Sequence, residues 1–268
     1  MTAISVIIPA FRAYDHLPRA LKSITAQGVS ADDLEVVIAP DDGGDYTFAR
    51  DFWPRVRIAR SHLRATGPGA ARNRAIAAAR GGYLAFLDAD DAWGEGYLNA
   101  LLPLARRHGL AFAPTKVNTA EGELLITLGE GLRRLSIADF GHWPGSFHPL
   151  VDRHASPGFD DGAGQDVRHA MALLERAGRA APMAMTTAYH LHLSATSVTA
   201  DPAFARRIDR RYRQMITAHQ LRRTPAFGMG RLAAIHALEA RRRWNMRFLA
   251  SGGHAHGFYG MLASQIKK

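Results

Sequence analysis

In the first hundred residues, short apolar runs alternate with segments whose apolar residues recur at helical spacing. A continuous apolar run is typical of a strand buried on both faces, and apolar residues three and four positions apart predict a helix. The strands predicted in this way are 4–9, 34–39, 56–59 and 83–87, and the predicted helices are 13–27 and 68–80. This alternation predicts an α/β fold with a mostly parallel central sheet flanked by helices.

The pattern is less regular after residue 96. The elements expected there are helices 97–108 and 166–177, a strand 110–117 paired as a hairpin with 123–128, and a last strand or extended loop at 186–198. Residues 133–148 show no clear period and predict a loop with local turns. The Gly- and Asp-rich stretch 157–164 predicts a mobile loop. The pattern therefore predicts the structure of the middle of the chain less completely than that of its beginning.

The composition changes after Asp201-Pro202. Two long helices are expected at 203–223 and 229–249, followed by a short apolar tail at 254–268. The formal net charge of the chain is +10, and residues 201–268 alone contain 14 Lys and Arg against three Asp and Glu. Such an excess points to an anionic partner: a membrane surface, a nucleic acid or a polyanionic substrate.

Other features of the composition exclude several classes of protein. The chain has no cysteine, which excludes disulfides, thiolate nucleophiles and Cys-based zinc sites. The N-terminus lacks the basic start and apolar core of a signal peptide, and no stretch approaches the roughly 20 apolar residues of a spanning helix. We expect a cytoplasmic protein.

Three carboxylates end the predicted strand 83–87: Asp88, Asp90 and Asp91. Like charges at the end of a buried strand are normally tolerated only beside a cation or a cationic side chain. Asp88 and Asp90, at i and i+2, point to the same side of an extended segment, which suits a divalent cation with phosphate ligands. The alternative is an acidic turn that caps a helix beginning near Trp93. This stretch alone leaves both interpretations open.

Two other segments end at the same edge of the predicted sheet. Pro9 closes the first strand, and Asp41-Asp42 follow the second. In open α/β sheets, ligands bind beyond the carboxyl ends of the strands. We therefore expect Pro9, Asp41 and the 88–91 carboxylates to lie around one ligand-binding crevice.

Four motifs in this order resemble those of the family 2 glycosyltransferases. They are Val6-Ile-Ile-Pro-Ala-Phe11, Val36-Val-Ile-Ala-Pro-Asp-Asp-Gly43, Gly69-Ala-Ala-Arg-Asn-Arg74 and Phe86-Leu-Asp-Ala-Asp-Asp91. The resemblance covers about residues 4–200 and implies an inverting enzyme of GT-A fold that uses a nucleotide-diphospho-sugar. It implies a GT-A domain at 1–200, with a nucleotide-binding half (1–102) and an acceptor-binding half (103–200). Residues 201–268 would form a basic helical extension.

The resemblance assigns residues to the nucleotide. Pro9, Phe11 and Asp41 would line the base pocket, with Asp41 accepting a hydrogen bond from a uracil-type ring N–H; its alternative role is to build the turn with Gly43-Gly44. Arg72 and Asn73 would approach the nucleotide and its phosphates, although an exposed helix arginine is the alternative for Arg72. Arg74 and Arg80 are interpreted as surface residues.

The resemblance also favours a metal at the acidic strand end, where Asp88-Ala-Asp90 matches the DxD motif. Asp90 would be the more direct ligand of Mg²⁺ or Mn²⁺, with Asp88 nearer the ribose and the sugar. Asp91 would then be free to cap the following helix. Near residue 190, Tyr189-His-Leu-His192 resembles a Tyr-Arg-x-His segment in which His192 would contact the diphosphate, with His190 at the usual arginine position. Satisfied strand histidines are the alternative, and no spacing supports a zinc site.

The general base is expected at the start of helix 166–177. The family places there a Glu-Asp pair preceded by glycine, and Gly164-Gln165-Asp166 is the matching stretch. Asp166 keeps the carboxylate that would accept the proton of the acceptor hydroxyl, whereas Gln165 replaces the usual Glu. Asp160 and Asp161 in the preceding loop are the substitutes.

The basic extension has three interpretations. Arg-rich helices with Trp, Phe, Met and Leu can lie on an anionic membrane surface, which would suit lipid-linked acceptors of surface polysaccharides at the inner face of the plasma membrane. Nucleic-acid binding is disfavoured because no known module is present. The third interpretation is helices packed on the catalytic domain with solvated basic faces.

The sequence thus predicts a metal-dependent inverting glycosyltransferase of hexosyltransferase type. The donor would be a UDP-sugar and the acceptor a saccharide or a lipid-linked hydroxyl. A nucleotidyltransferase is disfavoured, because Pro9 to Tyr14 replaces the Gly-rich phosphate loop expected after its first strand. A degenerate relative that binds a sugar nucleotide or polyanion without turnover is the non-catalytic alternative, and Gln165 is its main support.

Overall fold

The computed structural model describes residues 3–194, 198–223 and 228–266. Its main sheet has six strands in the order β3-β2-β1-β4-β10-β6. These are β1 (Ile4–Ala10), β2 (Leu34–Pro40), β3 (Val56–Ile58), β4 (Tyr83–Phe86), β6 (Leu110–Ala111) and β10 (Leu150–Asp152). β1 to β4 run parallel, and β10 runs antiparallel to both of its neighbours. The predicted α/β class with a mostly parallel sheet is confirmed.

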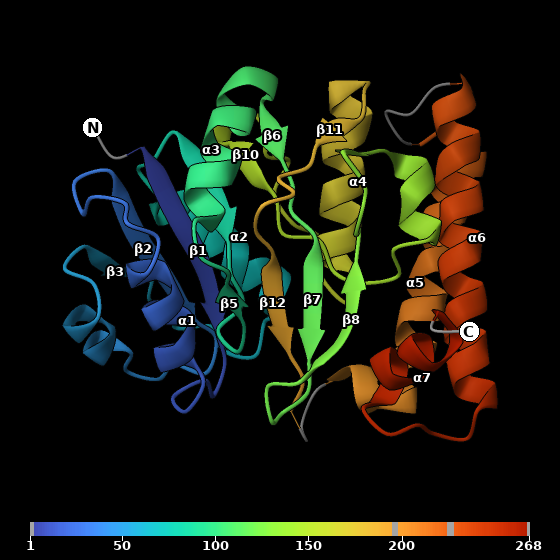
Figure 1. Cartoon of the computed structure of the whole chain (residues 1–268), viewed down its shortest axis with the longest axis horizontal. Coiled ribbons are helices and arrows are strands. Elements are labelled where there is room, and N and C mark those ends of the chain that lie inside the picture. The colour runs from blue at the N-terminus through green and yellow to red at the C-terminus, as the bar shows by residue number, and fades with distance from the viewer. Residues whose placement is uncertain (1–2, 195–197, 224–227, 267–268) are drawn as a thin grey trace.

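The register of the parallel strands brings their carboxyl ends together. Pro9 of β1 lies opposite Ala39 of β2, and Ile7 lies opposite Phe86 of β4. Alternate residues of β1 face two different cores, one on each side of the sheet. The helices that follow the strands cover these faces: α1 (Leu17–Thr25), α2 (Pro68–Ala78) and α3 (Tyr97–His108). The predicted convergence of the strand ends is therefore present (Figure 1).

A second sheet stands beside the first, in the order β5-β12-β7-β8. Its strands are β5 (Ala92–Trp93), β7 (Thr115–Asn118), β8 (Leu124–Leu128) and β12 (Tyr189–His192). The predicted β7–β8 hairpin is confirmed. The single strand predicted at 110–117 is wrong: β6 pairs with the main sheet and β7 with the second, and Pro114 between them has no N–H for a ladder. Residues 195–197 of the stretch predicted at 186–198 lie outside the described residues.

Several short strands and 3-10 helices complete the fold. They are β9 (Arg134–Leu135), β11 (Ala181–Pro182), η1 (Thr47–Asp51), η2 (Ile137–Gly141), η3 (Arg153–Ala155) and η4 (Val198–Ala200). The predicted loop with local turns at 133–148 thus contains one short strand and one short helix. Helix α4 (Gln165–Ala177) begins one residue before its predicted start.

Three helices form the basic extension: α5 (Pro202–Gln220), α6 (Gly228–Ala250) and α7 (Gly257–Ile266). Figure 1 shows them along the side of the molecule beyond β8 and α4. The predicted apolar tail is in fact the helix α7, and its residues Gly257 to Ala263 are buried. Phe248 and Leu262 belong to the same hydrophobic core as Phe86. The extension therefore packs on the preceding part of the chain.

No helix in the described part of the chain combines the length and apolar character needed to cross a membrane.

Candidate active site

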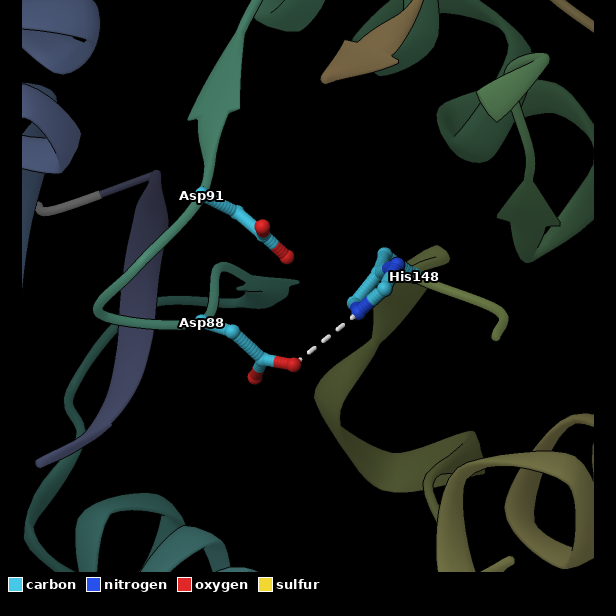
Figure 2. Close-up of side chains that lie close together, drawn as sticks. All are labelled: Asp88, Asp91 and His148. Atoms are coloured by element: carbon cyan, nitrogen blue, oxygen red, sulfur yellow. Dashed lines mark hydrogen bonds and ion pairs between the residues drawn. The ribbon is translucent and has the colours of Figure 1, made fainter. Parts of the chain in front are cut away.

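Asp88 occupies the turn that follows β4, where α2 and the segment before β10 meet. Its Oδ1 atom accepts a hydrogen bond from Arg72 of α2, and its Oδ2 atom lies 3.4 Å from Nε2 of His148. Figure 2 shows Asp88, Asp91 and His148 converging from two different segments. Burial alone would raise the pKa of Asp88, but Arg72 and His148 outweigh it and hold the pKa below its ordinary value. Asp88 is thus a charged carboxylate already beside a cation.

Asp91 is buried and has two protein partners. Tyr189 donates its hydroxyl to Oδ2 over 2.7 Å, and the backbone N–H of His192 donates to Oδ1 over 2.9 Å. Burial, together with the neighbouring Asp90 and Asp88 charges, raises the pKa of Asp91 well above its ordinary value. The prediction that Asp91 caps a helix near Trp93 is wrong, because Trp93 lies in β5 and α3 starts only at Tyr97, after Gly96. Asp91 instead ties β12 to the acidic strand end.

His148 is a site residue that the sequence did not reveal. Its ring stacks on Tyr189 with centroids 3.7 Å apart, and it is buried with Nδ1 unpartnered within the described residues. It comes from the aperiodic segment before β10, where nothing in the pattern distinguishes it from His142 or His154. Only the antiparallel pairing of β10 with β4 brings it to Asp88.

Asp90 differs from its two neighbours. The residue is exposed, and Arg19 donates to its backbone carbonyl, not to its carboxylate. The pKa of Asp90 is nevertheless raised, first because the surrounding protein removes water from its carboxylate and then because of the charge of Asp88. Within the described residues its carboxylate forms no hydrogen bond or ion pair with another side chain. Asp90 is therefore the carboxylate at this strand end that is open to an external cation.

The donor set suits a hard divalent cation. Among residues 3–194, 198–223 and 228–266, one ligand atom from each of Asp88, Asp91 and His148 can come within 4.8 Å of the others. Carboxylate oxygens are the preferred ligands of Mg²⁺ and Mn²⁺, and each can accept a second interaction beside its present one. The sequence prediction named Asp88 and Asp90. The structure brings Asp88 together with Asp91 and His148, and leaves Asp90 outside that group.

Asp41 lies directly after β2 and is buried. Its Oδ1 atom accepts from Arg74 over 2.8 Å and from the Thr66 hydroxyl, and its Oδ2 atom accepts from the Gly67 N–H over 2.7 Å. Burial raises the pKa of Asp41, but these hydrogen bonds outweigh it and lower the pKa below its ordinary value. The interpretation of Arg74 as a surface residue is wrong, because its guanidinium forms an ion pair with Asp41; Arg80 is exposed as predicted.

Arg72 is almost completely buried between Asp88 and Phe159. Its guanidinium carbon lies 5.3 Å from the Phe159 ring centroid, and its Nε and Nη1 atoms have no hydrogen-bond partner within the described residues. Burial disfavours its charge, but Asp88 and then Asp166 outweigh that effect and raise the pKa of Arg72. The exposed-arginine alternative is thereby excluded. Two buried donor nitrogens without a partner beside the acidic strand end are suited to an anionic ligand.

Asn73 is engaged elsewhere. Its amide nitrogen donates to the Phe159 carbonyl, and its Oδ1 accepts from the Phe159 N–H, both over 2.8 Å. These two bonds fix the loop that precedes α4. The amide that was expected to approach the nucleotide therefore supports the loop.

The carboxylates near the start of α4 differ in their surroundings. Asp160 Oδ2 forms ion pairs with Arg211 over 2.8 Å and with Arg168 over 3.3 Å, whereas Asp161 is exposed. Asp166 lies in the first turn of α4, half-buried, and has no hydrogen bond or ion pair within the described residues. Gln165 is buried, and its Oε1 is also unpartnered there. Asp166 is therefore the unengaged carboxylate on this side.

The remaining predicted residues lie at the edges of the site. Pro9 is partly buried in β1, and Phe11 after it is 51% exposed, with the Arg12 guanidinium 5.3 Å from its ring. His192 is half-buried; burial and then Arg19 lower its pKa to about 4, so the ring is neutral at pH 7. Neither His190 nor His192 belongs to the group of metal-ligating side chains found among the described residues.

The chain is similar in sequence to known glycosyltransferases. The family described as Glycosyl transferase family 2 matches residues 5–153. The chain is 32% identical over 145 residues to the succinoglycan biosynthesis protein ExoO of Rhizobium meliloti, a match that spans 53% of this chain and 39% of ExoO. It is 27% identical over 112 residues to the UDP-Glc:alpha-D-GlcNAc-diphosphoundecaprenol beta-1,3-glucosyltransferase WfgD of Escherichia coli, spanning 41% of this chain and 43% of WfgD. The chain thus covers less than half the length of either relative.

Solved structures show the same fold. S. aureus TarS 1–349 in complex with UDP-GlcNAc superposes with a TM-score of 0.61 at 16% identity, over 80% of this chain and 67% of that chain. A second structure of S. aureus TarS 1–349 gives a TM-score of 0.59 at 13% identity, over 94% of this chain and 93% of that chain. At such identities the similarity concerns the fold alone. It confirms the predicted GT-A fold.

Proposed function

Because the chain belongs to the family 2 glycosyltransferases, we propose that it transfers a sugar with inversion from a nucleotide-diphospho-sugar to an acceptor hydroxyl. The donor is a UDP-sugar and the acceptor a saccharide or a lipid-linked saccharide of surface polysaccharide biosynthesis. Relatives named for succinoglycan biosynthesis and for a UDP-Glc-dependent transfer to a diphosphoundecaprenol acceptor support this choice. So does the fold shared with TarS in complex with UDP-GlcNAc.

The observation that carries the proposal is that two carboxylates, Asp88 and Asp166, have different surroundings. Asp88 is charged and paired with Arg72, whereas Asp166 has no partner within the described residues and still contributes to the raised pKa of Arg72. A paired carboxylate suits binding, and an unengaged one suits proton transfer. Both lie within electrostatic reach of one buried guanidinium, so a single substrate can contact both sides.

In this mechanism Asp166 is the general base. It accepts the proton of the acceptor hydroxyl while that oxygen forms a bond to the anomeric carbon, and the bond from this carbon to the diphosphate oxygen breaks on the opposite face. The bonding electrons leave with the nucleoside diphosphate. Arg72, whose Nε and Nη1 atoms have no hydrogen-bond partner within the described residues, and His192 are the proposed contacts to the diphosphate. Nδ1 of His192 already donates to the His190 carbonyl over 3.1 Å, so Nε2 is the atom that faces this role.

The nucleotide base is proposed to lie against Pro9 and Phe11. Asp41 is buried beside the carboxyl end of β2 and is the proposed acceptor of a ring N–H of the base. Mg²⁺ or Mn²⁺ is proposed at Asp90 and Asp88, with Asp91 and His148 beside Asp88 as further candidate ligands. When bound, such an ion would neutralise charge that builds on the leaving diphosphate.

Replacing Asp166 by Asn tests the base directly. We expect turnover to fall by about 10² to 10⁴, because the amide keeps the size of the side chain and cannot accept the proton. The measurement is release of UDP from UDP-glucose and UDP-N-acetylglucosamine with Mn²⁺, alongside thermal shifts with each donor, which should persist in the variant. Wild-type turnover in Asp166→Asn together with loss in Asp161→Asn would move the base to Asp161. Donor binding without turnover in the wild type would favour the non-catalytic alternative, for which the unpartnered Gln165 is the supporting observation.

An anionic membrane surface is proposed as a partner of the outer face of the extension. Four exposed arginines support it, none with an ion pair within the described residues: Arg206, Arg210, Arg222 and Arg223. Flotation of the full chain with anionic and with neutral vesicles tests it, and equal recovery with both would contradict it.

A further inference from the structure

The segment between Gly158 and Asp166 is fixed on one side by α2. Besides the two Asn73 hydrogen bonds to Phe159, the backbone of α2 approaches the segment directly: a Cβ added at Gly69 would lie 2.2 Å from the Asp160 carbonyl oxygen. Only glycine fits this contact. One wall of the segment is therefore the helix that also carries Arg72.

The other wall is α5 of the basic extension. Arg211 Nη2 lies 2.8 Å from Asp160 Oδ2. A Cβ at Gly164 would lie 3.5 Å from Ile208 Cγ1 and 3.6 Å from Tyr212 Cε1, so these two side chains pack beside the Gly164 backbone. Ile208, Arg211 and Tyr212 are related by i, i+3 and i+4 and form one face of the helix. One face of α5 thus contacts the segment at both ends.

Gly164 is where this contact acts on Asp166. It is the N-cap of α4 with a φ of 71°, a left-handed conformation that sets the direction in which the helix begins. Asp166 follows two residues later, in the first turn. The pKa of Tyr212 is raised, chiefly by burial and in part by the charge of Asp166, which places the α5 face within electrostatic reach of that carboxylate.

The α5 face is itself anchored to the catalytic part of the chain. Arg241 of α6 is buried and donates from Nε to the Tyr212 hydroxyl over 2.8 Å. Its two terminal nitrogens donate to three backbone carbonyls around η2, those of Phe140, Trp143 and Gly145. Tyr212 is therefore held at its tip as well as by packing, and the face can act as a fixed support.

We propose that the face of α5 formed by Ile208, Arg211 and Tyr212 is a positioning surface that holds Asp166 in place for catalysis. The inference rests on the proposed role of Asp166 as the general base. A base must lie within hydrogen-bond reach of the acceptor hydroxyl, and a displacement of about 1 Å can cost about 100-fold in rate. The basic extension then belongs to the catalytic machinery, although it lies outside the region that matches the family.

Arg211→Ala in the full chain is the main test, with Arg213→Ala as its matched control. Arg213 lies on the same helix but pairs with Asp209 inside the extension. With UDP-glucose and UDP-N-acetylglucosamine as donors, we expect kcat to fall about tenfold in Arg211→Ala, with the donor KM changed by less than about twofold. Arg213→Ala should behave as the wild type. Arg211→Lys should recover part of the loss, because it keeps the charge without the planar fork.

Hydrogen exchange separates positioning from a general loss of stability. The amides of residues 160–168 should exchange faster in Arg211→Ala, while its thermal midpoint matches that of Arg213→Ala. Asp160→Ala should cost less in Arg211→Ala than in the wild type, because the Arg211 ion pair is then already absent and only the Arg168 ion pair remains to be lost. A wild-type kcat with unchanged exchange in Arg211→Ala, or fully additive losses in the double variant, would overturn the inference.

The two proposals fail in different ways. An active Asp166→Asn enzyme removes the base and with it the reason for a positioning surface. An inactive Asp166→Asn enzyme beside a fully active Arg211→Ala enzyme leaves the proposed function intact and contradicts only the role of α5.

Discussion

Asp41 and Asp88 each lie beside a guanidinium of α2, whereas Asp166 has no ion pair within the described residues. The first two carboxylates and both guanidiniums come from one stretch, residues 41–88, in the half that we propose binds the nucleotide. The segment that carries Asp166 is held by Asn73 on one side and by Arg211 on the other. The surroundings of Asp41 and Asp88 are set by neighbouring motifs, whereas the segment that carries Asp166 is held by contacts from distant parts of the chain.

Because the two regions are held by different contacts, substitutions in each should affect different properties of the protein. Changes in α2 around Asp41 should alter donor binding, because they remove charges that fix the strand ends. Changes in the extension should alter turnover or stability, because they release the helix that begins at Gly164. Three substitutions outside the residues proposed to touch the substrate test that division.

Arg241→Leu should have the largest effect on stability. Its guanidinium is buried and makes four hydrogen bonds, to Tyr212 and to three carbonyls, so its loss leaves buried acceptors unpaired. We expect the free energy of unfolding to fall by about 3 kcal/mol, measured by urea denaturation. Arg243→Leu, at an exposed position of the same helix, is the control and should change it by less than about 0.5 kcal/mol. Equal effects in the two variants would show that the extension is not anchored through Arg241.

Glu175→Gln probes the joint between α4 and α5, with a smaller effect that depends on pH. Glu175 Oε1 lies 3.5 Å from His219 Nε2, with both side chains almost fully buried. Burial raises the pKa of Glu175 to about 7 and lowers that of His219 to about 4. The folded state therefore binds more protons at Glu175 than the unfolded state between about pH 4.5 and 7, and that contribution to stability is lost as the pH rises through 7.

Glu175→Gln has no titrating group at this position, so it does not lose this contribution to stability as the pH rises. We expect the stability of Glu175→Gln relative to the wild type to rise by about 2 kcal/mol between pH 5 and pH 8, measured by denaturation at both pH values. His219 gives the opposite slope between about pH 4 and 6.5 in both proteins and cancels in the comparison. A relative stability that falls with pH would mean that Glu175 and His219 form a charged pair.

Arg74→Ala should have the smallest of the three effects, confined to the donor. Removing the guanidinium leaves Asp41 with the Thr66 hydroxyl and the Gly67 N–H as partners. We expect the donor KM to rise about fivefold, about 1 kcal/mol, with kcat little changed. Arg80→Ala, two residues beyond the end of the same helix, should leave KM unchanged. A lower kcat with an unchanged KM would place Arg74 on the acceptor side.

The fold of the first 102 residues could be predicted from the sequence because its pattern is local. Strands such as 4–9 are continuous apolar runs, and the residues at their carboxyl ends must meet when the strands are parallel. Asp88 is a case where position after a buried strand predicted the site. Arg74 was missed because helical spacing does not show that a side chain turns toward the previous strand end.

The other half depends on contacts that no local pattern encodes. His148 reaches Asp88 only because β10 runs antiparallel between β4 and β6, in a stretch with no period. Asp91 was expected to start a helix because Asp commonly does so, but partners about 100 residues away, Tyr189 and His192, bind it instead. The role of Arg211 depends on an ion pair across 51 residues.

The shared hydrophobic core also has a consequence for synthesis. Met261 and Leu262 belong to the same core as Ile7 and Phe86. At roughly 5–20 residues per second, a ribosome needs about 10 to 35 s to travel from Phe86 to Met261. During that interval one apolar face of the nascent sheet lacks part of its final cover and is available to chaperones. Folding of the active site is therefore completed late in translation or after it.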